Sequence, residues 1–414
     1  MRYNIPMKEK IIAIIGGGAG GMLCAHALAA GGASGVVLLE RGARLGRKLS
    51  ATGNGQGNVT NLHMDEGHYF SDDPAKVGRI LRESSPADLL EYFGALGGLF
   101  ESDEQGRVYP CSRQAAAVTD LLRFALDRAG VKCLSAHTVD AISAEKGKYV
   151  LRFAEGGALT ADVVVLATGG KAAKNFGTDG KGYALARSLG HTVTPLFPAL
   201  VQLKTDTAHI RGLKGVRVNC LARAFDGQKE LRHARGDVIF TDYGVSGNAI
   251  FLLSSHLTDA SSPRLTIDFL PDRTEKELTI FLQKKASFCP RESLLGCVLP
   301  GALGRAVLRR AAEENGGGFM PDEAARLVKN YSLRVTGTLG FDGAQVTRGG
   351  VPLSETDEGL QSLRAKNVYF CGEILNVDGE CGGYNLHWAF ASAMRVARDI
   401  LRRTGQFAPI KEKV

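Results

Sequence analysis

One stretch near the start of the chain decides the fold: Ile11-Ile12-Ala13-Ile14-Ile15-Gly16-Gly17-Gly18-Ala19-Gly20-Gly21. Residues 11–15 form a continuous apolar run, which is typical of a parallel strand buried on both faces. The glycines then follow the pattern Gly-x-Gly-x-x-Gly, and residues 22–30 are rich in helix formers until two further glycines end them. This order of strand, glycine turn and helix predicts the first unit of a Rossmann-like α/β fold.

The glycine turn is expected to bind the phosphates of a dinucleotide. Gly16 permits the tight turn, Gly18 lets a pyrophosphate approach the backbone, and Gly21 lets the helix pack on the strand. Free N–H groups and the helix dipole favour negative charge at the start of the helix. The alternative is a glycine-rich turn in an ordinary βα unit. The predicted contacts are Gly16, Gly18, Ala19, Gly20 and Gly21.

A second apolar run, residues 36–39, is followed directly by Glu40, which stands 19 residues after Gly21. An acid at this place accepts hydrogen bonds from the hydroxyls of the adenosine ribose. It disfavours a 2′-phosphate, so NADP is a poor fit to this site. The motif alone does not choose between FAD and NAD.

The composition is that of a folded protein with an excess of glycine. Hydrophobic residues make up 44% of the 414 residues and charged residues 23%, which argues against a disordered chain. Glycines number 52, about one residue in eight, whereas ~7% is usual. Nearly half of them lie in residues 1–60, 156–182 and 372–383. The excess therefore indicates places where the backbone approaches a ligand closely.

The net charge of +8 is spread evenly along the chain. An even excess is a weak argument for nucleic acid, so we expect no nucleic-acid partner and a small-molecule substrate instead. None of the eight cysteines forms Cys-x-x-Cys or clusters with histidine at zinc spacing, so no metal site is predicted. Residues 11–30 resemble an export or membrane segment, but their glycines favour strand, turn and helix. We expect a cytoplasmic protein without membrane association.

The segment after Glu40 offers a second stretch of ligand contacts. Residues 41–49 contain adjacent cations, and residues 50–61 are rich in glycine and asparagine. Such a segment presents N–H groups, amides and positive charge to a pyrophosphate, a ribityl chain or a flavin edge. The alternative is a solvated surface loop. The predicted contacts are Arg41, Arg47, Lys48, Leu49, Asn54 and Asn58.

Residues 46–49, Gly-Arg-Lys-Leu, precede a loop that ends Asn58-Val59-Thr60-Asn61. This pattern resembles the YhiN-type family of flavoproteins, also described as BaiN/RdsA-like NAD(P)/FAD-dependent oxidoreductases, with aminoacetone-oxidase relatives. The family usually has Arg and Cys where this chain has Gln56 and Gly57. The resemblance continues through residues 106–110, 161–170, 240–247, 371–373 and 378–386.

The resemblance covers nearly the whole chain and implies an α/β fold. Its core would be a Rossmann-like FAD-binding domain of the two-dinucleotide-binding-domain flavoprotein type, interrupted by a β unit and a small helical unit. We expect residues 1–194 and 346–414 to form the split FAD-binding domain, residues 195–271 the β domain and residues 272–345 the small helical domain. The implied cofactor is FAD, with NADH or NADPH as a transient reductant.

A buried strand at residues 163–166 ends in small residues, which let a backbone lie against a ligand. Residues 131–135, 138–143 and 149–153 are expected to form strands before it. In flavoproteins of the resembling type one such strand binds adenine through its backbone; the alternative is a plain meander. The predicted contacts are Val139, Ala167, Thr168 and Gly169.

A late strand at residues 368–371 leads to a glycine-rich loop and then a helix that reaches about residue 403. The resemblance implies that the start of this helix faces the flavin pyrimidine, where its free N–H groups would stabilise the negative charge of a reduced flavin. Asp378 would bind ribityl or phosphate-side hydroxyls, and Glu373 would order the loop. Asn376 stands where the family more often has Asp. The predicted contacts are Gly372, Glu373, Asp378, Gly383, Tyr384 and Asn385.

Without a Ser–His–Asp set, the chemistry is expected to belong to the flavin. The candidates for catalytic proton transfer are Tyr384, His387 and Cys381. His387 has a suitable ordinary pKa but could equally pack on a helix face. Cys381 would be reactive if the helix dipole lowered its pKa, or it could simply fill space.

Three functions remain open from the sequence. The first is NAD(P)H-driven reduction of an unsaturated small organic substrate by hydride transfer through flavin N5, which the resemblance favours. The second is flavin-dependent oxidation of a small amine. The third is an RNA-directed or non-catalytic flavoprotein.

Overall fold

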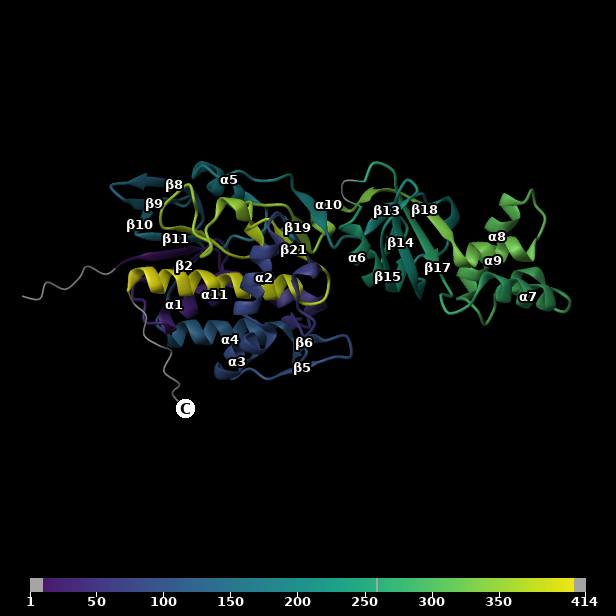
Figure 1. Cartoon of the computed structure of the whole chain (residues 1–414), viewed down its shortest axis with the longest axis horizontal. Coiled ribbons are helices and arrows are strands. Elements are labelled where there is room, and N and C mark those ends of the chain that lie inside the picture. The colour runs from purple at the N-terminus through teal and green to yellow at the C-terminus, as the bar shows by residue number, and fades with distance from the viewer. Residues whose placement is uncertain (1–9, 258–259, 406–414) are drawn as a thin grey trace, which may run out of the picture. The chain divides into compact units, whose positions relative to one another are not determined.

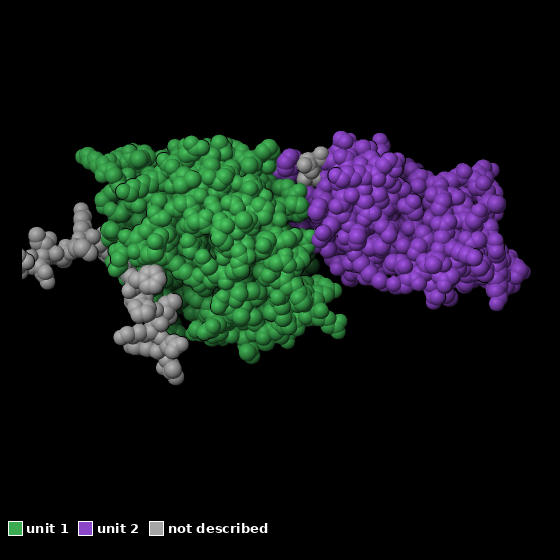
Figure 2. Space-filling model, viewed as in Figure 1, with its two compact units in different colours: residues 1–196, 346–414 green, residues 197–345 purple. Residues whose placement is uncertain are grey.

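The computed structural model describes residues 10–257 and 260–405. The chain forms two compact units, residues 1–196 with 346–414 and residues 197–345 (Figure 2). Each unit has its own cluster of buried hydrophobic side chains.

The first unit is built on a parallel five-stranded sheet with the strand order β20-β11-β1-β2-β7. Ile14 of the central strand β1 pairs with Val165 on one side and Leu38 on the other. Strands β1, β2, β11 and β20 are almost wholly buried because helices and a second sheet cover both faces, which explains their continuous apolar sequences. The edge strand β7 is partly exposed and more polar. The strands are β1 (Ile12–Ile15), β2 (Val36–Glu40), β7 (Lys132–Ser135), β11 (Val163–Leu166) and β20 (Val368–Phe370).

Helices α1, α4 and α11 lie on one side of this sheet, and a small antiparallel sheet and α5 lie on the other (Figure 1). The small sheet has the order β10-β9-β8. These elements are α1 (Ala19–Ala30), α4 (Ala115–Arg128), α5 (Lys181–Ser188), α11 (Tyr384–Thr404), β8 (Val139–Glu145), β9 (Lys148–Phe153) and β10 (Ala158–Ala161). The predicted Rossmann-like α/β fold is confirmed.

Short elements complete the first unit. Two small sheets, β3-β6-β5 and β21-β4, bring the loop after β2 beside the segment before α11. Helix α3 begins with a capping box between Ser85 and Asp88. The elements are β3 (Thr60–Asn61), β4 (Tyr69–Ser71), β5 (Phe100–Ser102), β6 (Arg107–Pro110), β19 (Val346–Arg348), β21 (Val377–Gly379), α2 (Pro74–Glu83), α3 (Pro86–Ala95), and the 3₁₀ turns η1 (Leu49–Gly55), η2 (Glu66–His68), η3 (Lys174–Phe176), η6 (Leu353–Glu355) and η7 (Gly372–Ile374).

The second unit is a closed barrel with the strand order β13-β16-β15-β14-β17-β18 and a group of helices inserted between β17 and β18. Its strands are β12 (Phe197–Ala199), β13 (Leu203–Thr205), β14 (Arg217–Asp226), β15 (Lys229–Phe240), β16 (Gly244–Ser246), β17 (Pro263–Asp268) and β18 (Tyr331–Thr338). Its helices are α6 (Asn248–Ser254), α7 (Glu275–Ala286), α8 (Gly301–Glu314), α9 (Pro321–Lys329), α10 (Gly340–Gly343), η4 (Ala208–Ile210) and η5 (Arg291–Ser293).

The insert differs in one respect from the sequence expectation of a β domain at 195–271 followed by a helical domain at 272–345. Strand β18 lies in the second range but belongs to the barrel, where Arg264 pairs with Arg334. In the closed barrel, β18 pairs with β17, so β17 has no exposed strand edge. Helices α7, α8 and α9 are therefore an excursion between two barrel strands.

Among the described residues, none of the helices has the length and apolar character that a membrane span requires.

Candidate cofactor and active site

The glycine turn after β1 leaves little or no room for a side chain at four of its five glycines. A Cβ added to Gly21 would lie 1.8 Å from the Gly16 carbonyl oxygen, and one added to Gly20 would lie 3.0 Å from that of Ala389. A Cβ at Gly18 would meet nothing within 4 Å. Gly18 is also the N-cap of α1 and makes no side-chain cap, so the first N–H groups of α1 are open to an anion.

Glu40 ends β2 directly beside this turn. Its Oε2 accepts a hydrogen bond from the Gly17 N–H at 2.8 Å, and its Oε1 accepts one from the Gly42 N–H at 2.6 Å. A carboxylate has about four acceptor positions, so capacity remains for ribose hydroxyls. The His137 N–H donates to the Glu40 carbonyl at 3.0 Å, which brings the approach to β8 and Val139 to the same end of the sheet.

The three cations predicted to contact the cofactor have protein partners. Arg41 pairs with Asp179 at 2.8 Å, and Arg47 donates to the Asn175 carbonyl at 3.0 Å. Lys48 pairs with Glu373 at 2.7 Å. These contacts join the loop after β2 to the loops after β11 and β20.

The glycine- and asparagine-rich loop divides into an exposed tip and a buried end. Asn54 is exposed at the tip with φ +55°, whereas Leu49 is buried. The Asn58 Oδ1 is buried without a hydrogen-bond partner, and a Cβ added to Gly383 would lie 2.8 Å from it. The structure thus places Asn58 beside the residue that precedes α11.

Helix α11 begins in a buried setting. Its N-cap, Gly383, has φ +102°, and a Cβ there would lie 2.3 Å from the Thr60 carbonyl oxygen. No side chain caps this end, so its first N–H groups are available to a ligand. The Asn385 side chain holds the preceding segment, because its Oδ1 accepts from the Gly379 N–H at 2.9 Å and its Nδ2 donates to the Gly379 carbonyl at 2.7 Å.

Asp378 is the buried polar side chain that most clearly suits a ligand. It is 1% exposed, and neither of its carboxylate oxygens takes part in a hydrogen bond. Burial raises its pKa to about 7, although Arg348, whose Nε lies 3.4 Å away, opposes the shift. The Thr168 Oγ1 is likewise buried without a partner. Buried polar atoms are rarely left unsatisfied, so Asn58, Thr168 and Asp378 fit a ligand that carries hydroxyl groups, as the ribityl chain of FAD does.

Glu373 connects its loop to two other segments of the first unit. It joins Lys48 through one oxygen, and its other oxygen accepts from the Thr347 N–H at 2.8 Å. Ala167 and Gly169 lie at the end of β11, and Gly372 follows β20, so all three reach the carboxyl edge of the sheet.

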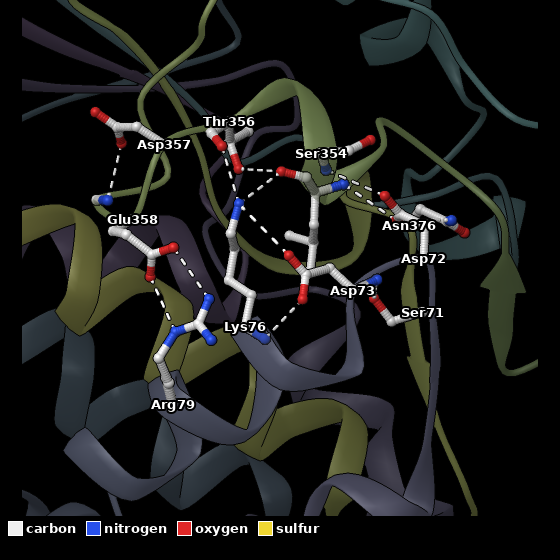
Figure 3. A network of polar contacts seen from close by, with 12 residues as sticks. Ser71, Asp72, Asp73, Lys76, Arg79, Ser354, Thr356, Asp357, Glu358 and Asn376 are labelled. Atoms are coloured by element: carbon white, nitrogen blue, oxygen red, sulfur yellow. Dashed lines mark hydrogen bonds and ion pairs between the residues drawn. The ribbon is translucent and has the colours of Figure 1, made fainter.

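The Asn376 side chain is hydrogen-bonded to another residue of the protein (Figure 3). Its Nδ2 donates to the Asp72 Oδ1 at 3.0 Å, and Asp72 also accepts the N–H groups of Leu353 and Ser354 at 3.1 Å each. The buried Lys76 donates to the carbonyls of Leu353 and Thr356 at 2.9 Å each. This network fastens the loop before Asp378 to the start of α2.

Two proton-transfer candidates do not match their expected chemistry. His387 is wholly buried, its Nδ1 lies 2.8 Å from the Thr60 Oγ1, and burial lowers its pKa to about 4, so the ring is neutral at pH 7. Burial raises the pKa of the Cys381 thiol, so the condition under which Cys381 would be reactive is not met.

Tyr384 keeps its proton at neutral pH, because burial raises its pKa to about 12. Its ring stacks on His68 with centroids 4.4 Å apart, and the His68 Nδ1 lies 2.9 Å from the Glu380 Oε2. Sequence reasoning missed His68 because only the long-range pairing of β4 with β21 brings it here. Within the described residues, no group of three or more His, Cys, Asp or Glu side chains is arranged to hold a metal ion.

The family model described as the HI0933-like protein Rossmann domain matches residues 10–399. The chain belongs to this family. The resemblance to the YhiN-type proteins is thereby confirmed. The chain is an enzyme, a flavin-dependent oxidoreductase.

Two relatives align with the chain over nearly its full length. It is 37% identical to the 3-dehydro-bile acid delta(4,6)-reductase of Clostridium scindens, covering 95% of this chain and 99% of that protein. It is 28% identical to the ribosomal RNA dihydrouridine synthase of Escherichia coli, covering 94% of this chain and 97% of that protein. Among solved structures, 3-ketosteroid-delta4-(5alpha)-dehydrogenase from Rhodococcus jostii RHA1 is similar in fold, with 17% identity, a TM-score of 0.51, and coverage of 95% of this chain and 97% of that one.

Proposed function

We propose that this enzyme binds FAD and uses NADH or NADPH to reduce a carbon–carbon double bond conjugated to a carbonyl group in a small organic substrate. The observation that carries the proposal is the gathering of Gly18, Glu40, Asp378 and the start of α11 at the carboxyl edge of one parallel sheet. Ligands bind at this edge in open α/β sheets.

Each part of FAD has a matching group in this set. The N–H groups at the start of α1 suit the pyrophosphate, and Glu40 suits the adenosine ribose. Asp378 and Asn58, whose buried oxygens lack hydrogen-bond partners, suit ribityl hydroxyls. When bound, FAD supplies hydride acceptance and donation at its N5 atom.

The chain contributes electrostatics and exclusion of water. Tyr384 and Trp388, at the start of α11, are 5% and 2% exposed, so the helix N–H groups act in a region of low dielectric. With FAD bound, they would stabilise negative charge on the pyrimidine side of its ring system. Of the three candidates for proton transfer, we favour Tyr384 as the donor, since it is the first residue of α11 and carries a protonated hydroxyl.

The substrate class is inferred from chemistry that two relatives share. Their names describe reduction of a double bond, in a bile acid and in uridine, and the bile acid reductase is the more similar. In an α,β-unsaturated carbonyl compound, hydride adds to the β-carbon and a proton adds to the α-carbon. The balanced reaction consumes one NAD(P)H and one proton for each double bond.

The test separates the two half-reactions. The purified protein is expected to be yellow and to bleach within seconds when mixed anaerobically with NADH or NADPH, and the bleached form is expected to regain its colour with 4-androstene-3,17-dione. Bleaching by a small amine instead of NAD(P)H would contradict the proposal in favour of an amine oxidase. A colourless protein that takes up no FAD would overturn it altogether.

A second candidate keeps the chemistry but changes the substrate. Similarity to the ribosomal RNA dihydrouridine synthase supports action on uridine in RNA. Reoxidation of the bleached enzyme by unmodified ribosomal RNA but not by the steroid would favour this candidate.

A further inference from the structure

Arg41 and a loop far along the chain close a ring over the end of β1. The Arg41 guanidinium pairs with the Asp179 carboxylate at 2.8 Å and also donates to the Gly177 carbonyl oxygen. Arg41 directly follows β2, whereas Gly177 and Asp179 belong to the loop between β11 and α5. We call residues 171–180 the strap.

The strand order shows what lies beneath the strap. Strand β1 stands between β2 and β11, and all three strands are parallel. A contact from the loop after β2 to the loop after β11 must therefore pass over the carboxyl end of β1. The glycine turn and the start of α1 lie there, and Glu40 lies at the adjacent end of β2.

A second contact pins the same two loops together. The Arg47 Nη2 donates to the Asn175 carbonyl at 3.0 Å. The strap is itself folded, because the Thr178 hydroxyl donates to the carbonyls of Ala172 and Ala173. The closed ring is thus a defined structure with two points of attachment.

We propose that the Arg41–Asp179 pair retains the adenosine half of bound FAD, so that the pair must break before the cofactor leaves. The proposal rests on the proposed FAD function and assigns Asp179 and the strap to the cofactor site. The two side chains are 31% and 22% exposed, so salt screens their attraction. Lys181, whose Nζ lies 3.9 Å from Asp179, is a further charged group at the pair.

The sign of the effect of Asp179→Asn decides between two roles. If Asp179 only faced the FAD phosphates, removal of its charge would relieve repulsion and slow FAD release. If it retains FAD through Arg41, the same variant speeds release. A half-exposed ion pair is worth up to about 1 kcal/mol, which corresponds to about fivefold in the release rate.

FAD release is measured as the rise in flavin fluorescence after holoprotein is diluted, at about 50 mM and about 500 mM NaCl, which span a wide range of screening. We expect Asp179→Asn and Arg41→Gln to release FAD about fivefold faster at low salt. The double variant should be no faster than either, and Asp179→Glu should restore retention. High salt should speed release in the wild type and leave Asp179→Asn unchanged.

Asp162→Asn is the matched control, since the Asp162 carboxylate is also 22% exposed and pairs with Lys148, but at the opposite end of the sheet. It should leave the release rate unchanged. Slower or unchanged release from Asp179→Asn overturns the retention role, whereas a wild-type protein that binds no FAD overturns the proposed function. Thermal unfolding of the FAD-free proteins shows whether a variant is also less stable. For a less stable variant, restored retention in Asp179→Glu supports the retention role, and continued fast release in Asp179→Glu overturns it.

Discussion

The α-carbon of Gly21 lies against the carbonyl oxygen of Gly16, so close that a Cβ on Gly21 would stand 1.8 Å from that oxygen. Three residues earlier, a Cβ on Gly18 would meet nothing within 4 Å. The two glycines therefore have different tasks. Gly21 allows α1 to pack on β1, and Gly18 leaves space for a ligand.

Alanine at these two positions should separate folding from cofactor binding. Gly21→Ala forces α1 away from β1, and we expect it to lower the free energy of unfolding by about 3 kcal/mol or to prevent folding. Gly18→Ala should fold normally, because φ at this N-cap is −80°, but should bind FAD at least tenfold more weakly. Denaturant unfolding and FAD titration of the FAD-free proteins check both. Equal loss of stability in the two variants would contradict this division.

Asp378 should make the stability of the FAD-free protein depend on pH. Its native pKa is about 7 and its unfolded pKa 3.8, so between these values the unfolded state has released a proton that the native state retains. Stability then falls as pH rises from about 4 to about 7, by up to roughly 4 kcal/mol. Asp378→Asn should not lose stability over this pH range and should be more stable than the wild type at pH 7.

His387 gives an opposite slope, because its lowered pKa makes stability rise with pH between about 4 and 6.5. His387 is present in both the wild type and Asp378→Asn. The difference between their free energies of unfolding therefore reports the contribution of the Asp378 carboxylate alone. Urea unfolding at pH 4, 5.5 and 7 measures it. A constant difference across this range would show that Asp378 ionises normally.

Asn376 should not tolerate the Asp that the resembling family more often has. Its Nδ2 lies 3.0 Å from the Asp72 Oδ1, so Asn376→Asp places two carboxylates together and loses a hydrogen bond. We expect a loss of about 1 kcal/mol at pH 7 that high salt reduces. The pair Asn376→Asp with Asp72→Asn should remove the charge repulsion but recover only part of the loss, because Asp72→Asn replaces one of the two oxygens that accept the N–H groups of Leu353 and Ser354. Thermal unfolding of the four proteins forms the double-mutant cycle.

Gln56 and Gly57 should respond differently to the residues that the family usually has. Gly57 has φ +76°, and a Cβ there would lie 2.7 Å from the Ala115 Cα at the start of α4. Gly57→Cys should therefore destabilise the fold by about 2 kcal/mol or more. Gln56 is exposed, so Gln56→Arg should change the free energy of unfolding by less than about 0.5 kcal/mol. Chemical denaturation tests both, and a well-folded Gly57→Cys protein would refute the steric argument.

Much of the nucleotide-binding architecture could be predicted because its signals are local. The apolar runs of β1 and β11, the glycine turn and the long final helix each depend on residues close together in sequence. Parallel strands place their carboxyl ends at one edge, so the predicted contacts from residues 16–40, 167–169 and 372–385 converge without knowledge of side-chain packing.

The features that the sequence could not predict involve contacts between distant segments. The partners of Arg41, Arg47 and Lys48 lie more than 120 residues away, so the sequence indicated only that three cations were present. The dipole argument for Cys381 neglected burial, which raises its pKa. The place of β18 in the barrel likewise depends on its pairing with β17.

The sequence by itself determined the family, the order of strand, turn and helix, and the residues available for a flavin nucleotide, because backbone conformation and apolar periodicity are written in neighbouring residues. The tertiary structure alone decided which side chains are buried, which charges are paired and which polar atoms lack partners. Burial and pairing depend on which distant segments pack together, and these set the ionisation of Asp378, His387 and Cys381.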